Sequence, residues 1–401
     1  MAAEHRDRAD EIVGASGPPW RTWVVVLAAA GLLVGYLVAH RRPAAERLAP
    51  APEAAGATLA PGGGSVSGTR IGPGPPGLRL LVGGSSPRLV DAATGVSTFL
   101  DVPGVGTGAP AWLVPTGRAV AAFVTPLLSG PHAPGQAAGA RVAFLVRPRL
   151  PAVPLGAADG GVAAWDGGVI TMVRTVTGSV LTGFGPDGVR RWQRRAPAAV
   201  EPRADTRHGL LVQVADPSGA GRFGALQLVD PVTGRLRREV AHSATTVLAT
   251  RNDTVAWLGA GSCPPDCAVR VSELASGTTR TVSRQLRHLP AGGAFSPDGR
   301  WLALTFETGW PVDGFSRYPD GRVGLVDLGS ATVSAVHGYG GIYPPAWVDW
   351  SHDGRLVVML TGQAGRERIR IAVAQQPGRP AAFTLLPWSS FYATASLGVA
   401  P

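Results

Sequence analysis

The sequence predicts an all-β fold, and three features indicate it: composition, alternation of apolar residues and a repeated turn motif. The 401 residues include 55 Gly and 36 Pro, and only 16% are charged. This composition suits many short strands joined by tight turns better than long amphipathic helices. From residue 78 onward, short apolar alternations are broken by Gly-containing turns, as at 368–373, where Ile369, Ile371 and Val373 alternate with Arg or Ala. Such alternation is typical of strands with one buried face.

An apolar segment near the N-terminus, residues 22–40, is predicted to be a transmembrane helix that follows a short cytoplasmic tail, residues 1–21. Thr22 to Ala39 carry no charge, and at about 1.5 Å per residue they span about 27 Å, enough to cross a bilayer. Trp20 and Trp23 lie at one end, where aromatic rings prefer the headgroup region. A cleaved signal peptide is the alternative, but Leu37 stands where a small residue is expected before the cleavage site.

Cysteine decides the predicted orientation, because the arginines that flank the apolar segment are balanced. The flanking arginines are Arg6, Arg8 and Arg21 on one side and Arg41, Arg42 and Arg47 on the other. Cys263 and Cys267 are the only two cysteines and flank Pro-Pro-Asp, which fits a small disulfide in an oxidising compartment. The eight histidines are dispersed, so we expect no metal site. The C-terminal domain is therefore expected to be extracytoplasmic.

Between the apolar segment and the domain, residues 41–77 are expected to form a linker. They are mostly Ala, Pro, Gly and Ser, a composition that buries too little apolar surface to offset the entropy of ordering. Residues 72–77 read Gly-Pro-Gly-Pro-Pro-Gly, a formal match to the dinucleotide-binding fingerprint. That motif must open a helix, which the prolines forbid, so we expect no dinucleotide and no other cofactor.

Two segments of the C-terminal region are near copies of each other. Residues 295–304 read Phe-Ser-Pro-Asp-Gly-Arg-Trp-Leu-Ala-Leu, and residues 350–359 read Trp-Ser-His-Asp-Gly-Arg-Leu-Val-Val-Met. Each predicts a strand, an Asp-Gly turn and a second strand. The motif resembles the WD40-like repeat of TolB-type β-propellers, which implies a propeller fold for residues 78–401. Asp298 and Asp353 are interpreted as turn residues, because the hairpin alone explains them.

Weaker turns continue the repeat, and successive turns are about 41 to 55 residues apart, the period of a four-stranded propeller blade. Each is followed by a second hairpin marker, as at 230–234 and 273–277, which accounts for six blades. A marker at 91–95 has about three strands around it, and the apolar tail 391–399 could supply the innermost fourth strand. The fold expected is therefore a propeller of about seven four-stranded blades, closed by its two chain ends.

In this arrangement the long loops join the second and third strands of their blades and share one rim, which we expect to be the working face. One loop, 308–321, contains residues of the kinds that anchor protein interfaces and sugars: Trp310, Phe315, Arg317 and Tyr318. These four are the predicted binding residues. The alternative is that the aromatic side chains of this loop fold back over the blade as a lid. Trp347 and Trp350 are expected to pack between blades.

Composition argues against nucleic acid as a partner, although the formal net charge is +10. The chain has no Lys, and its arginines are scattered, as the coding bias of a GC-rich bacterium would give. The function expected is a non-catalytic recognition module for a protein or polysaccharide of the cell envelope. A propeller enzyme with a channel-lining site, and a sensor that acts with a partner subunit, are the alternatives. No catalytic residues are predicted, because the sequence contains no Gly-x-Ser-x-Gly elbow.

Overall fold

The structure, a computed structural model, describes the chain from residue 70 onward with gaps. The chain divides into two compact units, Met1–Thr58 and Leu59–Pro401, and the described residues belong to the second. The predicted tail and transmembrane segment lie outside them, and within the described part of the chain no helix is long and apolar enough to cross a membrane. The described ranges are 70–105, 110–117, 119–124, 141–196, 198–215, 223–259, 267–286, 289–306, 323–336, 345–360, 368–380, 382–387, 391–392 and 397–400.

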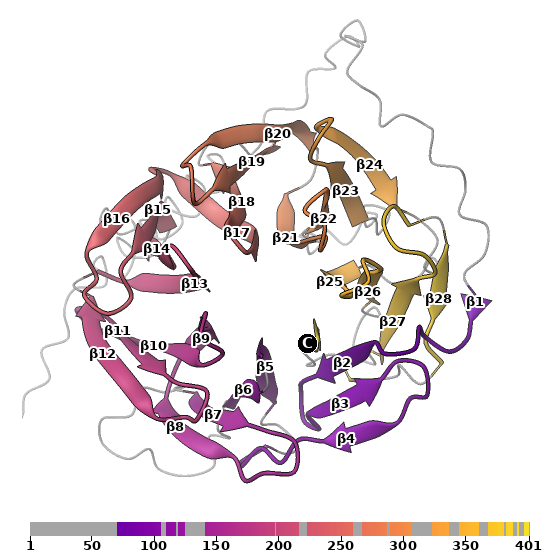
Figure 1. The fold of residues 1–401 in the computed structure, drawn as a ribbon, viewed down its shortest axis with the longest axis horizontal. Coiled ribbons are helices and arrows are strands. Elements are labelled where there is room, and N and C mark those ends of the chain that lie inside the picture. The colour runs from indigo at the N-terminus through magenta and orange to yellow at the C-terminus, as the bar shows by residue number, and fades with distance from the viewer. Residues whose placement is uncertain are drawn as a thin grey trace, which may run out of the picture. The chain divides into compact units, whose positions relative to one another are not determined.

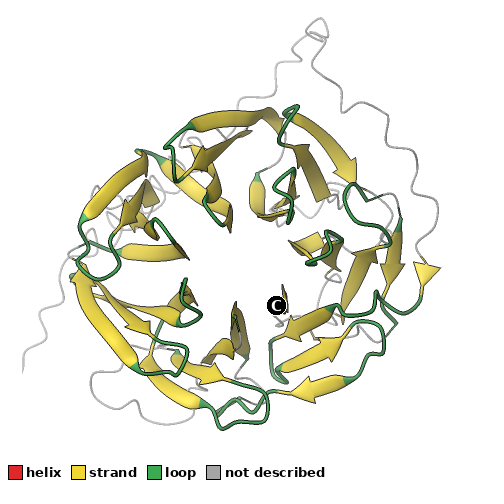
Figure 2. Ribbon diagram, viewed as in Figure 1, coloured by secondary structure: helices red, strands yellow, loops and turns green. Residues whose placement is uncertain are grey.

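Seven antiparallel sheets surround a central axis in the second unit, and each sheet is one blade (Figures 1 and 2). The innermost strands are β30, β5, β9, β13, β17, β21 and β25. Blade one contains β2 (Arg79–Val82), β3 (Arg88–Asp91), β4 (Ser97–Phe99) and β30 (Leu397–Val399); blade two contains β5 (Ala111–Thr116), β6 (Ala119–Val124), β7 (Val142–Val146) and β8 (Val153–Ala157); blade three contains β9 (Gly160–Ala163), β10 (Val169–Thr175), β11 (Gly178–Phe184) and β12 (Arg190–Ala196).

Four more blades complete the ring, so the predicted seven-bladed propeller is confirmed. Blade four contains β13 (Val200–Thr206), β14 (Gly209–Ala215), β15 (Phe223–Val229) and β16 (Leu236–Ala241); blade five contains β17 (Ala244–Arg251), β18 (Thr254–Gly259), β19 (Cys267–Glu273) and β20 (Thr279–Leu286); blade six contains β21 (Pro290–Phe295), β22 (Trp301–Phe306), β23 (Val323–Asp327) and β24 (Thr332–Val336); blade seven contains β25 (Pro345–Trp350), β26 (Leu356–Leu360), β27 (Arg368–Ala374) and β28 (Phe383–Leu385).

The two ends of the propeller meet in blade one. Strand β30 pairs antiparallel with β2, and Leu80 faces Val399 while Val82 faces Leu397. The prediction that the C-terminal tail supplies the innermost strand of this blade is thus confirmed. Closure covers the inner edge of β2, which protects that strand from pairing with other chains.

Two short strands add to blade seven. Strand β1 (Arg70–Ile71) pairs parallel with β28, and β29 (Phe391–Tyr392) pairs with β27. Strand β1 lies within residues 41–77, the segment for which the sequence predicts a linker. The propeller therefore includes at least the last residues of that segment.

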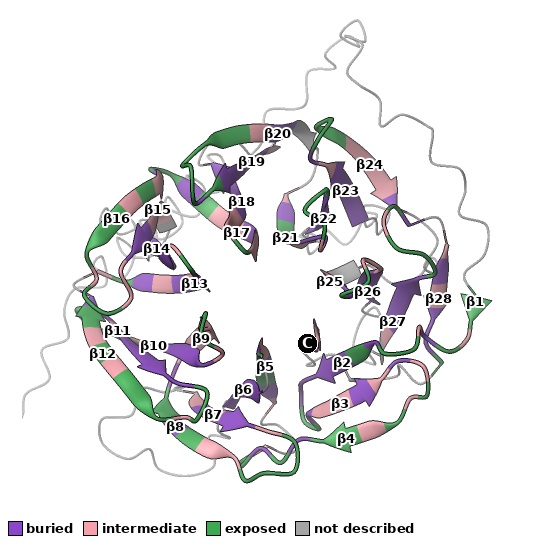
Figure 3. Ribbon diagram, viewed as in Figure 1, coloured by how far each residue is buried: buried purple, intermediate pink, exposed green. Residues whose placement is uncertain are grey.

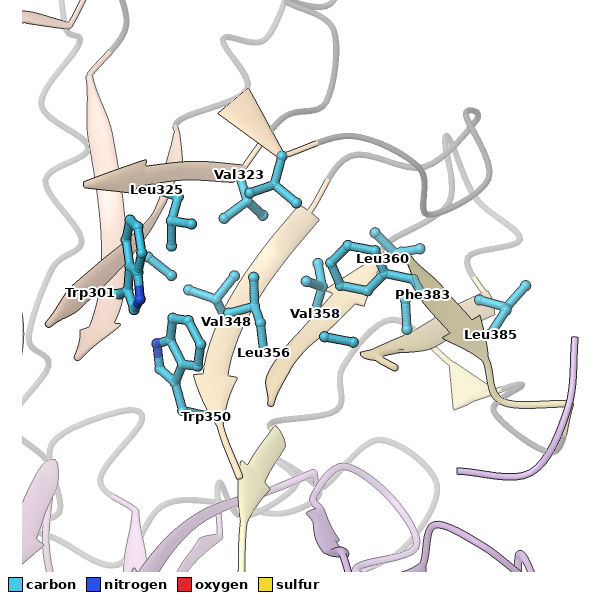
Figure 4. Close-up of a cluster of buried hydrophobic side chains, with 14 residues drawn as sticks. Trp301, Val323, Leu325, Val348, Trp350, Leu356, Val358, Leu360, Phe383 and Leu385 are labelled. Atoms are coloured by element: carbon cyan, nitrogen blue, oxygen red, sulfur yellow. The ribbon is translucent and has the colours of Figure 1, made fainter. Parts of the chain in front are cut away.

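The core lies between blades, because each sheet packs against a neighbour on both faces. The second strands of the blades are accordingly mostly apolar, and every residue of β6 and of β26 is buried (Figure 3). Figure 4 shows one of these contacts, where Trp301 of blade six meets Val348 and Trp350 of blade seven. Trp347 packs on the cluster that joins blades seven and one. Both tryptophans, Trp347 and Trp350, thus lie between blades as the sequence predicts.

The Asp-Gly turns are held by local hydrogen bonds of the aspartates. The Asp298 carboxylate accepts from Ser296 Oγ (2.5 Å) and from the backbone N–H of Arg300 (3.1 Å), and Gly299 takes the left-handed conformation at φ 70°. These hydrogen bonds, led by that of Ser296, lower the pKa of Asp298. Asp353 makes the same contact with Ser351. The interpretation of both aspartates as turn residues is therefore confirmed.

Arginines of the outermost strands join neighbouring blades. Arg194, Arg238 and Arg280 each donate to a backbone carbonyl in the hairpin that joins the third and fourth strands of the next blade. The shortest of these bonds runs from Arg280 Nη1 to Leu328 O (2.6 Å). Charged donors of this kind fix the spacing of blades three to six at the periphery of the ring.

Candidate functional site

The propeller has two distinct rims. The hairpins between first and second strands, and those between third and fourth strands, lie on one, which we call the hairpin rim. The connections between second and third strands leave from the opposite one, the loop rim, because neighbouring strands run antiparallel. The long connections at 125–141, 216–222, 260–266, 307–322 and 361–367 all join second and third strands, as predicted.

The predicted binding residues Trp310, Phe315, Arg317 and Tyr318 lie in the connection 307–322, outside the described residues. Cys263 also lies outside them, and Cys267 begins β19. Neither the binding site nor the disulfide is tested by the structure, and both stay predictions.

A pocket that the sequence analysis missed lies on the hairpin rim between blades three and four. Its volume is about 380 Å³. Trp165 and Asp166, in the β9–β10 hairpin, form one side, and Thr206 and Arg207, at the β13–β14 hairpin, form another. We call it the inter-blade pocket. It lies on the rim opposite to the predicted working face.

The floor of the inter-blade pocket is apolar. Ile170 and Phe184 are buried, and the indole of Trp192 forms part of the wall. Trp192 packs directly on Gly183, where a Cβ atom would lie 2.3 Å from the indole ring. Glycine at this position therefore lets the indole approach the sheet and keeps the pocket open.

A backbone hydrogen bond fixes Trp165 at the mouth of the pocket. The Trp165 N–H of blade three donates to Asp205 Oδ2 of blade four (3.0 Å), while the Trp165 residue stays 59% exposed. Desolvation is the main cause that raises the pKa of Asp205, and the nearby Asp166 adds to the effect. The contact joins the two blades that form the pocket and fixes the backbone of an exposed indole, so Asp205 is a positioning residue.

Three arginines line the pocket, and each is held by a carboxylate outside the lining. Arg191 Nη2 lies 2.8 Å from Asp187 Oδ2, and Arg237 Nη2 lies 2.6 Å from Asp230 Oδ2. Arg207 pairs with Asp253 of blade five. The guanidinium groups are thus oriented before any ligand arrives, although pairs this exposed add little to stability.

A second polar cluster lies on the inner strand of blade four. Arg203 Nη1 lies 3.0 Å from Glu201 Oε1, and Arg203 Nε donates to Gln213 Oε1 (2.9 Å). Gln213 is fully buried, and its Nε2 donates to Ala244 O of blade five (2.8 Å). Burial lowers the pKa of Arg203, opposed by Glu201. The network satisfies its own polar groups and joins two blades, so we assign it a structural role.

A carboxylate lies at the closure of the ring. Asp349 of β25 accepts from the backbone N–H of Trp350 (2.8 Å) and of Val399 in β30 (3.3 Å). The residue is partly buried, and desolvation raises the pKa of Asp349 to about 6. The two hydrogen bonds lower the pKa, but they offset only part of the increase that desolvation causes. A single Asp in the otherwise apolar segment Pro-Ala-Trp-Val-Asp-Trp was the signal in the sequence.

This raised pKa predicts a stability that falls as pH rises. Between pH 4 and 6 the folded state holds a proton on Asp349 that the unfolded state has released, so the free energy of unfolding decreases across this window. At about 1.36 kcal/mol per pKa unit the decrease reaches at most about 3 kcal/mol. Asp349→Asn should lack this decrease. Urea unfolding of both proteins from pH 4 to 7 measures it, and parallel curves would contradict the assignment, because other carboxylates contribute equally to both.

Comparisons with known proteins support the propeller fold, and they support no specific activity or ligand. No family model matches the chain, and no curated protein matches it. The propeller domain of the Trilobed protease from Pyrococcus furiosus is 9% identical, with a TM-score of 0.50 over 71% of this chain and 83% of that one. The chain folds as a seven-bladed β-propeller.

Other similar structures have lower scores. A 6-phosphogluconolactonase-like protein from Bacteroides fragilis is 13% identical, with a TM-score of 0.46 over 77% of this chain and 98% of that one. TolB from Acinetobacter baumannii is 12% identical, with a TM-score of 0.40 over 78% of each chain. At these identities a likeness shows the fold alone, so activities of these propellers are not transferred to this chain.

Proposed function

We propose that this chain is a recognition module, a propeller held at the membrane by residues 22–40 that binds a protein or polysaccharide of the cell envelope without catalysis. The inter-blade pocket is the observation that carries the proposal. An apolar floor with a few oriented polar groups at the mouth is the usual form of a binding site, and about 380 Å³ falls within the range of roughly 300–1,000 Å³ for small-ligand sites.

The chemistry of the pocket favours binding over catalysis. A general acid or base must be able to reach the reacting group with its proton. Asp205 already accepts a hydrogen bond from the Trp165 backbone, and Arg191 and Arg237 are paired with aspartates. Each of these groups orients another group of the protein, which suits a site that holds a ligand in place.

We propose further that the propeller lies outside the cytoplasm. The support is the pair Cys263 and Cys267, which fits a disulfide of an oxidising compartment, together with the apolar segment 22–40. Protease added to intact spheroplasts should digest the propeller. Digestion only after lysis would contradict this orientation.

Capture from envelope extract tests the recognition function. The full chain, in detergent, is expected to retain a discrete partner, and the pocket variant Trp165→Ala/Arg207→Ala is expected to lose it. A variant with Ala at Trp310, Phe315, Arg317 and Tyr318 tests the loop rim, which we propose as a second contact surface. If neither variant reduces the capture, both proposed surfaces are wrong. If the parent captures nothing, the recognition function is wrong.

A further inference from the structure

We infer that the inter-blade pocket binds one ring of a neutral saccharide, an inference that rests on the proposed recognition function. The arrangement of aromatic surface, paired polar groups and charge in this pocket points to that ligand class.

The aromatic surface is exposed, and the backbone that carries it is anchored. Trp165 is 59% exposed at the mouth, and its hydrogen bond to Asp205 ties the backbone beneath the ring to the next blade. Trp192 adds a second indole in the wall. One face of a pyranose ring is made of C–H groups, and such a face packs on an indole, which offers a large apolar surface with little conformational entropy to lose.

The polar groups match hydroxyls, which both donate and accept hydrogen bonds. The guanidinium groups of Arg191 and Arg237 are held through Nη2 by Asp187 and Asp230, so their geometry is set by the protein. Asp166 lines the same pocket and supplies acceptor oxygens. Vicinal hydroxyls of a sugar can accept from the guanidinium groups and donate to a carboxylate at the same time.

The charge balance decides against an anionic ligand. The lining holds three guanidinium groups, Arg191, Arg207 and Arg237, and two carboxylates, Asp166 and Asp205. The three aspartates paired with the arginines, Asp187, Asp230 and Asp253, bring the carboxylates to five. Arg147 and Arg194 interact with Asp187 and Asp230, which brings the guanidinium groups to five as well. An anion or a cation would lose its hydration here without a net opposite charge to offset the loss, so a neutral ligand fits best.

An apolar side chain fits less well than a sugar. It would cover the arginine and aspartate groups at the mouth without replacing the hydrogen bonds that these groups make to water. Each buried and unpaired polar group is a substantial penalty, so a purely hydrophobic occupant would bind weakly. The hydroxyls of a saccharide ring replace those hydrogen bonds while its C–H face covers the indole.

Calorimetric titration of the full chain tests the inference, in a detergent without a sugar headgroup. The probes are neutral gluco-, galacto- and manno-hexaoses, with an oligogalacturonate as the acidic counterpart. We expect at least one neutral hexaose to bind and the oligogalacturonate to bind at least tenfold more weakly. Trp165→Ala should weaken the neutral ligand about tenfold, the usual size of an aromatic contact. Trp165→Phe should recover part of the loss.

Trp112→Ala is the matched control, because Trp112 of β5 in blade two is 58% exposed and lines no part of the pocket. It should bind like the parent. The inference is overturned if no saccharide binds, if the oligogalacturonate binds best, or if the Trp165 and Trp112 variants behave alike. If no saccharide binds while the pocket variant still loses an envelope protein in the capture experiment, the saccharide inference fails and the recognition function stands. If both experiments are negative, both fail.

Discussion

Truncation after Ser396 is expected to lower the free energy of unfolding by more than about 4 kcal/mol, because it removes the strand that closes the ring. The deletion removes β30 with its pairing to β2, and it removes the Val399 side chain from the cluster around Leu80 and Val90. It also removes the Val399 N–H that Asp349 accepts. Thermal unfolding followed by circular dichroism measures the loss.

Removal of Pro401 alone is the control, since it leaves β30 and the hydrogen bond from Ala400 N to Arg79 O in place. The longer truncation should also associate with other chains in size-exclusion chromatography, because β2 becomes an open edge. Equal unfolding midpoints for the two truncations would show that the blade does not depend on its C-terminal strand.

Replacement of Trp350 by Ala is expected to cost about 3–5 kcal/mol, the range for a large aromatic side chain removed from a core. Trp350 is 3% exposed and lies in one buried cluster with Trp301 and Leu325 of blade six. Its Nε1 also donates to Ala294 O (3.0 Å), a carbonyl that the substitution leaves without this donor. Urea unfolding at neutral pH measures the change.

Trp350→Phe separates packing from hydrogen bonding, since it keeps most of the apolar volume and should cost less than Ala. Trp112→Ala serves as the exposed control and should change stability by less than about 0.5 kcal/mol. A loss of similar size in the Trp112 and Trp350 variants would contradict the assignment of Trp350 to the interface between blades six and seven.

The fold was largely predictable because its signals are local. A turn such as Ser296 to Arg300 has its own hydrogen bonds and its own Gly299 at positive φ, so the hairpin can be read from five residues. Repetition of such turns then gives the blades. The pairing of β30 with β2 could be predicted by a different route, since a blade with three strands needs a fourth.

Strand β1 could not be predicted, because nothing local distinguishes it. Arg70 and Ile71 are both exposed, and they pair in parallel with Thr384 and Leu385, far away in the sequence. A strand of two residues without a buried side has no alternation to detect. Its surroundings, rich in Gly and Pro, favour the interpretation as a linker.

The inter-blade pocket could not be predicted from the sequence either, for a geometrical reason. Trp165, Trp192 and Asp205 belong to three separate strands or hairpins, and their meeting depends on how two twisted sheets face each other. The run Arg-Arg-Trp-Gln-Arg-Arg at 190–195 was a signal of something unusual on an outer strand. It could not show that Trp192 turns toward blade four, because β12 contains a bulge beside Gly183 that shifts the alternation.

The pairing of β2 with β30 also has a consequence for folding kinetics. Leu80 and Val399 lie at almost opposite ends of the described sequence, so their contact closes the longest loop that the propeller contains. Closing such a loop costs entropy before any pairing energy is recovered, and folds rich in distant contacts form slowly. During synthesis, all strands of blades two to six are made well before β30, so these blades can form first. Blade one is then the last to be completed, and a chain released too early keeps an open ring.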